Sequence, residues 1–510
     1  MKKTYAPAFI FLMILVSFSF LHFSIQNVTG EVYRGIDANY LQSLINEINM
    51  TNIKEHVKYF SSLGSRVSGY LGSYNASEYI YDYLRSLGLE TKYEYYSLPV
   101  PVDYGAEIKV FTPSTGYEKT IKAYPLWPNG GVQTCPIPED KISGPLIYGG
   151  DGSLSYFDGQ EIKDSIVLLD FNSFYWKNAL LLGARAVVFV EPYDTTRTIA
   201  QRLVLGIPFN FPRLYVSRED GEFLLSLINA GKPVYVTLSS NMRWEVKEER
   251  NVIAFLKGRS NVKTTIGLVS YFDSMSVVPS INPGASDALN AAILLEIARI
   301  FSKHPPANNI LFVFVSGHYE GLAGSRNFID KNFDLLGVNE DSEINLVMFA
   351  SIDVSSESKS IAIRTGENLG TFYDYGRIKY FDRSYAWIRQ KIYREYLPAL
   401  QSVTNKKYSI VQLELQEVTY TPIPVVVDAE PFALATGGGG ISFFTMNSMR
   451  VYALTPLDTE DRIKYENVEP QVEVILGITG SFACDNILIT LAPSRFSYLG
   501  WGFTLSLIHI

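Results

Sequence analysis

Cysteine and histidine are scarce in this chain. Its 510 residues include two cysteines, Cys135 and Cys484, and five histidines. Cysteines so few and so far apart exclude a cysteine-based zinc knuckle, and they leave one disulfide or two free thiols as open alternatives. Any histidine that binds a metal ion or acts as a base has to be His22, His56, His304, His318 or His509.

An excess of basic residues is also missing. Lys and Arg together number 44 against 52 Asp and Glu, so the net charge is −8, and the sequence has no long basic run. This balance argues against a nucleic-acid partner. Apolar residues make up 47% and charged residues 19% of the chain, which predicts a globular protein with large cores.

The N-terminus begins with Lys2 and Lys3, followed by an apolar run from residue 6 to residue 25. The run has about the 20 residues that a bilayer span requires, and no small-residue cleavage site follows it. We therefore expect a membrane anchor within residues 1–30, with the bulk of the chain outside the cytoplasm. A cleaved signal segment and a secreted protein are the alternative. In both cases the glycosylation candidates are Asn27, Asn49 and Asn75.

Periodic patterns divide the rest of the chain. Residues 38–90 have apolar side chains at helical spacing, which predicts three helices before an aromatic, strand-like stretch. From residue 251 onward, continuous apolar strands alternate with helices, the pattern of an α/β core with buried strands. Residues 379–403 form a long helical pattern rich in aromatic and basic residues. Residues 491–510 are apolar and predict a strand or the start of a further segment.

Residues from about 140 to 245 form a separate block of strands and short helices. The stretches SIVLLD, GARAVVFVEP and PRLYVSREDGEFLL resemble the protease-associated domain, a small β-rich module found inserted in exopeptidases and sorting receptors. An unrelated α/β insert is the alternative.

The most specific pattern lies between residues 267 and 353. It is composed of a strand, a glycine turn leading into a helix, and two further strands. With the preceding GSRVSGYLGS loop, this pattern resembles the zinc aminopeptidase family that includes bacterial leucyl-type aminopeptidases, glutamate carboxypeptidase II and the transferrin receptor. The resemblance implies the α/β fold of a zinc exopeptidase, a mixed sheet flanked by helices with its site at the carboxyl ends of the strands.

The residue patterns and the resemblance together predict the organisation of the chain. The expected parts are an anchor or signal segment (1–30), helices and a strand that join the core (38–100), a protease-associated-like insert (101–248), a peptidase-like α/β core (249–490) and an apolar C-terminal strand or start of a further segment (491–510).

Most side chains that bind two zinc ions in the family are exchanged here. The first histidine ligand corresponds to Tyr271, the glutamate pair to His318 and Tyr319, and the last histidine ligand to Leu454. Leucine cannot bind a metal ion, and a neutral phenol with a pKa of about 10 is a poor zinc ligand. Glu320 could replace the missing glutamate only if its strand slipped by one residue.

Three aspartates of the family's site remain. Asp287 and Asp353 correspond to metal ligands, and Asp273 corresponds to the aspartate that orients the site. Each also has a plainer interpretation. Asp287 is expected to cap a helix over 288–302, Asp353 to bond a neighbouring loop, and Asp273 to bond its own turn. Asp458 is expected in a turn or at a helix start.

These residues leave two functions open. The first is a membrane-anchored, extracytoplasmic peptidase-like protein that has lost two-zinc catalysis, needs no cofactor, and acts in binding an unknown protein or peptide or as a scaffold, for example as a structural subunit of a membrane complex. The alternative is an active exopeptidase with one zinc ion held by Asp287, His318 and Asp353. A histidine paired with a carboxylate is the plainer interpretation of His318. Asp428 and Phe432 match the family's substrate-side loop.

Overall fold

The computed structural model describes residues 37–129, 133–205, 209–336, 344–365, 388–412, 427–436, 439–446 and 448–485. The predicted anchor, Asn27, the first part of the 379–403 helical pattern and the C-terminal residues 491–510 lie outside these ranges. Within the described ranges, no helix is both long enough and apolar enough to cross a membrane.

Three helices open the described chain: α2 (Ala38–Asn46), α3 (Met50–Ser62) and α4 (Leu71–Ser86). The side chains of Asp37 and Asn49 accept hydrogen bonds from backbone N–H groups at the starts of α2 and α3, as good N-caps do. Each helix buries one apolar face in the core. The three helices predicted for residues 38–90 are therefore confirmed.

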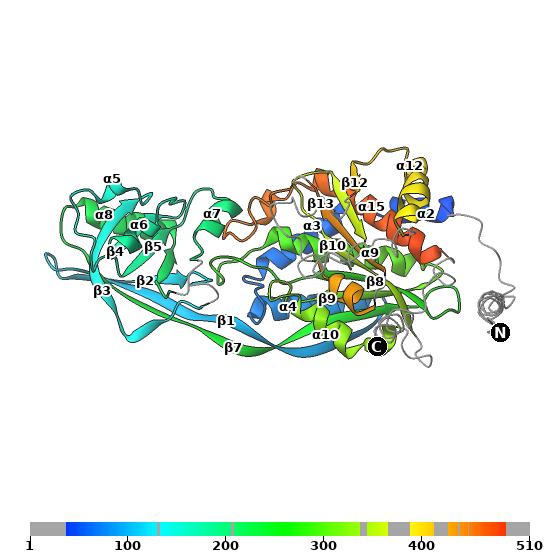
Figure 1. Ribbon diagram of the computed structural model, residues 1–510, viewed down its shortest axis with the longest axis horizontal. Coiled ribbons are helices and arrows are strands. Elements are labelled where there is room, and N and C mark those ends of the chain that lie inside the picture. The colour runs from blue at the N-terminus through cyan, green and yellow to red at the C-terminus, as the bar shows by residue number, and fades with distance from the viewer. Residues whose placement is uncertain are drawn as a thin grey trace, which may run out of the picture. The chain divides into compact units, whose positions relative to one another are not determined.

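A mixed sheet carries the core of the chain (Figure 1). Its central strands β8, β9, β10 and β13 are parallel to one another, while β7 joins β9 and β11 joins β13 in antiparallel pairs. Both faces of β8 and β9 are buried, as the continuous apolar runs predict. The bounds are β7 (Tyr235–Leu256), β8 (Thr264–Tyr271), β9 (Asn309–Val315), β10 (Asn345–Asp353), β11 (Ile361–Thr365), β12 (Ile410–Gln412) and β13 (Gly439–Thr445).

Helices cover both faces of this sheet. One face packs against α2, α3, α4, α9 (Ala285–Lys303), α12 (Leu397–Thr404) and α15 (Tyr465–Cys484). The other face packs against α10 (Ala323–Lys331) and α14 (Glu430–Thr436). The helical pattern predicted for 379–403 is confirmed over its described part, where a π-helical turn (Ile392–Tyr396) runs into α12.

The insert has its own strands and a separate hydrophobic core on each side of them. The strands β3, β4, β5 and β6 are neighbours, with β4 parallel to β3 and β5, and β6 parallel to β5. Their bounds are β2 (Tyr117–Pro125), β3 (Ile137–Gly150), β4 (Ile166–Asp170), β5 (Ala186–Val190) and β6 (Arg213–Val216), with helices α5 (Leu154–Phe157), α6 (Lys177–Leu181), α7 (Arg197–Arg202) and α8 (Arg218–Asn229). Cys135 in this part and Cys484 at the end of α15 are free thiols.

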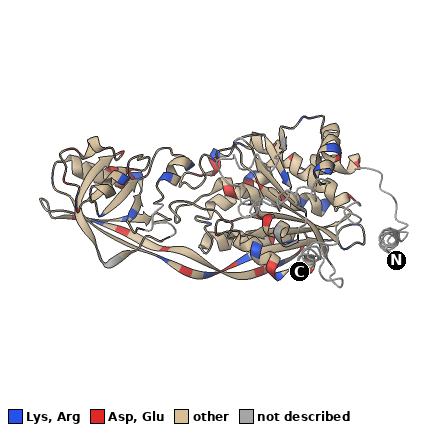
Figure 2. Cartoon of the chain, viewed as in Figure 1, with Lys and Arg blue, Asp and Glu red and all other residues tan. Residues whose placement is uncertain are grey.

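Two long strands join the insert to the core. β1 (Glu90–Thr112) pairs with β7 in antiparallel register from Glu90↔Phe255 to Phe111↔Tyr235, with one irregularity between Asp103 and Ala106. Basic and acidic residues are interspersed along this ribbon (Figure 2).

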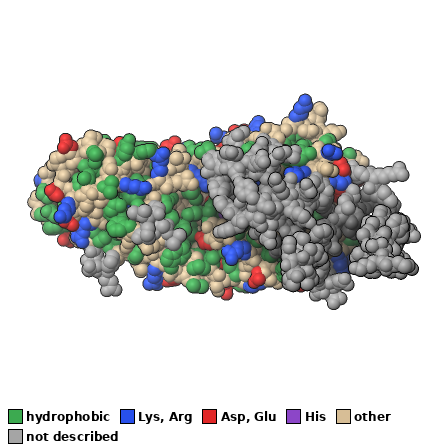
Figure 3. Space-filling model, in the orientation of Figure 1, with side chains coloured by type: hydrophobic (Ala, Val, Ile, Leu, Met, Phe, Trp, Pro, Cys, Tyr) green, Lys and Arg blue, Asp and Glu red, His purple; other side chains and the backbone are tan. Residues whose placement is uncertain are grey.

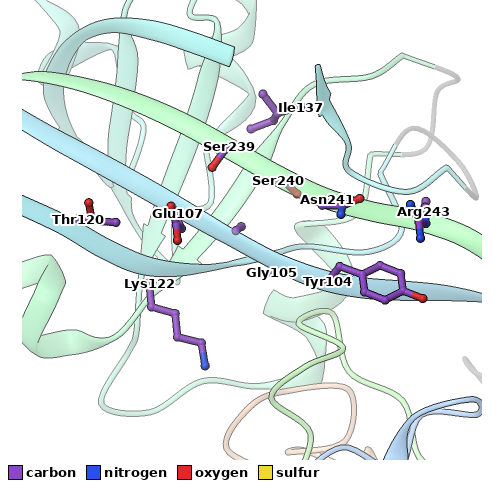
Figure 4. A pocket seen from close by; sticks show the side chains of 11 residues that line it. Tyr104, Gly105, Glu107, Thr120, Lys122, Ile137, Ser239, Ser240, Asn241 and Arg243 are labelled. Atoms are coloured by element: carbon purple, nitrogen blue, oxygen red, sulfur yellow. The ribbon is translucent and has the colours of Figure 1, made fainter. Parts of the chain in front are cut away.

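A cavity of about 890 Å³ lies beside the ribbon where β2 and β3 join it (Figure 4). It is lined mainly by polar side chains, among them Tyr104, Lys122, Asn241 and Arg243, and by none of the residues that the sequence predicts for the site.

Candidate active site

The predicted site residues come from three adjacent parallel strands and one helix. Tyr271 ends β8, Asp353 ends β10, and His318 and Tyr319 follow β9 within a few residues. Asp287 lies in the first turn of α9. Because the carboxyl ends of parallel strands share one edge of the sheet, these side chains lie close together, as predicted.

Two phenol groups donate hydrogen bonds to the remaining ligand-position aspartates. The Tyr271 hydroxyl lies 2.9 Å from Asp353 Oδ1 and 3.4 Å from Asp287 Oδ1. The Tyr319 hydroxyl lies 2.7 Å from Asp287 Oδ1. This contact also confirms the predicted register, which places Tyr319 rather than Glu320 beside Asp287. Burial raises the pKa of both phenols well above the ordinary value, so both stay protonated.

Arg450 completes this group, and the sequence patterns did not identify it. Its Nη2 atom lies 2.6 Å from Asp353 Oδ1 and 2.8 Å from the Asp353 carbonyl oxygen, and its Nη1 atom lies 3.1 Å from the Tyr271 hydroxyl. Burial alone would raise the pKa of Asp353, but the Arg450 guanidinium outweighs it and holds that pKa below its ordinary value. Asp353 therefore bonds a neighbouring loop, as its plainer interpretation predicts. We call Tyr271, Asp287, Tyr319, Asp353 and Arg450 the Arg450 cluster.

The expected capping role of Asp287 is wrong. Helix α9 begins at Ala285, its N-cap is Gly284 with a φ of 53°, and Asp287 lies inside the first turn. Asp458 provides the cap instead, because its carboxylate accepts hydrogen bonds from the Ser286 backbone N–H and hydroxyl. The sequence predicts Asp458 in a turn or at a helix start within its own segment. The residues around Asp458 do not indicate that it caps α9, which lies far away in the sequence.

His318 is paired with a carboxylate. Its Nδ1 atom lies 2.8 Å from Asp428 Oδ2, and its ring stacks on Tyr271 with ring centres 3.9 Å apart. Burial disfavours the charged imidazole, but Asp428, Asp353 and Asp273 outweigh burial and raise the pKa of His318 to about 9. The ring is therefore a cation at neutral pH.

Asp273 does not bond its own turn, so that expectation is also wrong. Its Oδ2 atom accepts from the His318 backbone N–H at 3.1 Å and lies 3.2 Å from the Ser68 hydroxyl. The same hydroxyl lies 3.1 Å from Glu320 Oε2. Burial and the neighbouring Glu320 carboxyl raise the pKa of Asp273 well above its ordinary value, and burial raises that of Glu320 to about 7. We call Ser68, Asp273 and Glu320 the Ser68 cluster.

The remaining predicted residues have other surroundings. Leu454 has a φ of 67°, and its carbonyl oxygen accepts from the Val277 N–H. Phe432 is buried against Phe349, and Asp428 is buried with its second oxygen beside the Ser325 hydroxyl. The role of Asp428 and Phe432 next to a substrate stays a prediction.

The two described glycosylation candidates lie at the start of α3 and within α4. Asn49 is the N-cap of α3, and Asn75 belongs to α4. Neither position tests whether the asparagine is modified.

The donor atoms around the Arg450 cluster are few. Across the ranges that the structure describes, no three His, Cys, Asp or Glu side chains are grouped so that they could hold a metal ion. Leu454 offers no donor, and the hydroxyls of Tyr271 and Tyr319 already point at Asp287 and Asp353.

Comparisons of sequence show which known proteins this chain resembles. Residues 251–478 match the sequence pattern of Peptidase family M28. The chain is 22% identical to the aminopeptidase YwaD of Bacillus subtilis over 275 residues, which is 53% of this chain and 55% of that protein. It is 32% identical to nicalin of Caenorhabditis elegans over 94 residues, 16% of this chain and 17% of nicalin. The chain thus matches about half the length, or less, of these curated relatives.

Solved structures share the fold. A Peptidase M28 precursor from Shewanella amazonensis has a TM-score of 0.55 at 16% identity, with 88% of this chain and 96% of that chain covered. A zinc aminopeptidase from Bacillus subtilis has a TM-score of 0.52 at 18% identity, with 84% and 94% covered. From residue 251 to residue 478, the chain therefore has the sequence pattern and the α/β zinc-exopeptidase fold of peptidase family M28.

Proposed function

We propose that this chain is a peptidase-like protein that does not carry out two-zinc hydrolysis and acts by binding a protein or peptide partner or as a scaffold. The membrane anchor and the extracytoplasmic location predicted from residues 1–30 are part of the proposal. The observation that carries it is the chemistry of the side chains at the metal-ligand positions.

The residues present do not fit a two-zinc centre. Zinc in proteins is bound by imidazole, thiolate and carboxylate groups. At three ligand positions this chain has Tyr271, Tyr319 and Leu454. Both phenols are buried and protonated, and both donate their protons to aspartates that a zinc ion would need as ligands.

A general base is also missing from the family's position. A glutamate that activates water must accept a proton at neutral pH. The corresponding residue, His318, is paired with Asp428, and its raised pKa of about 9 makes it a cation. A protonated imidazole neither accepts a proton nor binds zinc. In the alternative of a single zinc ion held by Asp287, His318 and Asp353, the zinc ion would have to displace an imidazole proton from His318.

Binding is supported by surface composition as well as by the site. The insert exposes several large hydrophobic side chains, and hydrophobic side chains are spread over its visible face in Figure 3. Exposed apolar side chains mark an interaction surface where they form a contiguous patch. The most exposed among them are Leu154, Phe174, Leu181, Tyr193 and Val246.

The test is the metal content of the purified full chain after incubation with zinc and removal of the excess, combined with hydrolysis of aminoacyl amides. We expect less than about a tenth of an equivalent of zinc and no hydrolysis above the buffer rate. The zinc aminopeptidase of Bacillus subtilis, treated in parallel, is the positive control. One tightly held equivalent that disappears in His318→Ala, together with hydrolysis, would establish the single-zinc alternative; two equivalents would overturn the proposal.

A further inference from the structure

Arg450 occupies the part of the site where carboxylates converge. Its guanidinium contacts the side chain and the carbonyl oxygen of Asp353 and the hydroxyl of Tyr271, so all its described acceptors lie at the carboxyl ends of β8 and β10. Only 16% of the Arg450 side chain is exposed, and only 6% of that of Asp353. A buried carboxylate is stable only when an opposite charge or several hydrogen bonds neutralise it.

The backbone at Arg450 is strained in a way that needs support. Arg450 has a φ of 46°, in the left-handed region that side chains other than glycine seldom adopt. Such a conformation persists only when its surroundings enforce it, and it is commonly found at functional positions. In this backbone conformation the Arg450 guanidinium reaches Asp353, which lies 97 residues earlier in the chain.

Glu357 supplies that support. One of its carboxylate oxygens accepts hydrogen bonds from the backbone N–H groups of Met449 and Arg450, each at 2.8 Å, and from the Ser448 hydroxyl at 3.0 Å. Its other oxygen accepts from the Val451 N–H. Three successive N–H groups directed at one carboxylate fix the path of this segment on both sides of Arg450.

We infer that Arg450 is a built-in cation that takes the place of the metal charge among the aspartates, and that Glu357 is the residue that positions it. The inference rests on the proposed function, because both concern the same site. A guanidinium has one positive charge, donates in a planar fork that matches a carboxylate, and has no lone pair for a metal ion. It therefore neutralises Asp353 permanently and repels any dication from the cluster.

Chemical rescue tests the first part. In Arg450→Gly the left-handed backbone is relaxed and only the side chain is lost. We expect the midpoint of urea unfolding to fall, and about 10 mM guanidinium, far below denaturing concentration, to restore it with saturation. The same concentration of ammonium or sodium should restore little, and guanidinium should leave the wild type unchanged. In Arg450→Gly combined with Asp353→Asn, guanidinium should have no effect.

An unchanged midpoint in Arg450→Gly, or equal responses to guanidinium and ammonium, would overturn the inference. If Arg450→Gly does not fold alone, the refolding yield from urea becomes the readout, with guanidinium expected to raise it and ammonium not. The proposed function is tested separately by zinc content and hydrolysis in the wild type, so the two can fail independently.

A double-mutant cycle tests the role of Glu357. If Glu357 positions Arg450, then Glu357→Gln should lower the midpoint of urea unfolding much more in the wild type than in Arg450→Gly. We expect the effect on the unfolding equilibrium constant to differ by at least about threefold between the two backgrounds. A residue that only stabilises its own loop would give the same effect in both, and that result would remove Glu357 from the inference.

Discussion

Two acidic clusters lie within one site, and their charges are balanced in different ways. In the Arg450 cluster, Asp353 has a guanidinium partner and accepts from the Tyr271 hydroxyl, and Asp287 accepts from the Tyr319 hydroxyl. In the Ser68 cluster, two carboxyl groups lie beside one serine hydroxyl, which itself accepts from the Gly317 N–H. One hydroxyl proton can serve only one of the two carboxyl groups, and Asp273 Oδ1 has no hydrogen-bond partner among the described residues.

The difference indicates how each cluster balances the negative charge of its carboxyl groups when no metal ion is bound. In the Arg450 cluster a fixed guanidinium neutralises Asp353, while the Tyr319 hydroxyl partly offsets the burial that raises the pKa of Asp287. The Ser68 cluster is neutralised by taking up a proton, which agrees with the raised pKa values of Asp273 and Glu320. Asp353 should therefore keep its charge near neutral pH and be sensitive to substitution, whereas the Ser68 cluster should respond to pH and tolerate substitution better.

The largest difference in stability is expected between two variants that each carry one aspartate-to-asparagine substitution, one in each cluster. Asp353→Asn leaves Arg450 without its charged partner and should lower the free energy of unfolding by about 3 kcal/mol. Asp273→Asn replaces a carboxyl group whose raised pKa already keeps it protonated, so it should change stability at pH 7.5 by less than about 1 kcal/mol. Urea denaturation of both variants measures the difference. Equal losses in the two variants would show that the clusters are balanced alike.

The second prediction concerns pH. Burial raises the pKa of Glu320 from 4.5 to about 7. The proton is thus held more tightly in the folded state, so the stabilisation is complete below pH 4.5 and is lost as the pH rises through 7. The loss amounts to roughly 3 kcal/mol between these limits. In Glu320→Gln this part of the pH dependence should vanish, whereas substitution of the exposed Glu219 by Gln should leave it unchanged.

A smaller effect is expected from a single phenol. Tyr319→Phe removes the 2.7 Å hydrogen bond to Asp287, whose Oδ2 atom already lacks a partner within the described part of the chain. Because a buried acceptor is left poorly satisfied, we expect a loss of about 2 kcal/mol in unfolding free energy. Tyr117→Phe, at an exposed position, is the matched control. An identical result for both variants would mean that solvent replaces the lost hydroxyl at Asp287.

The smallest effect concerns a carboxyl group outside both clusters. Asp458→Ala removes the cap of α9 and should cost about 1 kcal/mol, while Asp458→Asn keeps an acceptor and should cost less. Thermal unfolding of the two variants measures this ranking. The reverse ranking would mean that the charge of Asp458, and not its capping bond, matters to the site.

Much of the fold was predictable because it depends on local periodicity. The helices α2, α3 and α4 and the buried strands β8 and β9 follow from the spacing of apolar residues. The convergence of Tyr271, Asp287, His318, Tyr319 and Asp353 was also predictable, since parallel strands end at a common edge and the motif spacing fixes the register.

The partners of these residues were not predictable. Arg450 follows Asp353 by 97 residues. Its backbone is in the left-handed region, and nothing in the sequence around an arginine indicates that conformation. Ser68 precedes Asp273 by 205 residues, and its loop looks merely polar. Such contacts depend on how distant loops meet over the sheet. The one available signal was chemical: aspartates kept without histidine ligands require some other positive group or proton.

The ribbon formed by β1 and β7 has a practical consequence for anyone who wishes to study the insert by itself. Cutting the chain at residues 100 and 248 severs both strands in the middle of their ladder, where Val100 pairs with Glu245 and Ser97 with Glu248. The freed ends would expose unpaired N–H and C=O groups that favour aggregation. A soluble fragment should therefore begin near Glu90 and end near Leu256, so that the whole ladder is carried along with the insert.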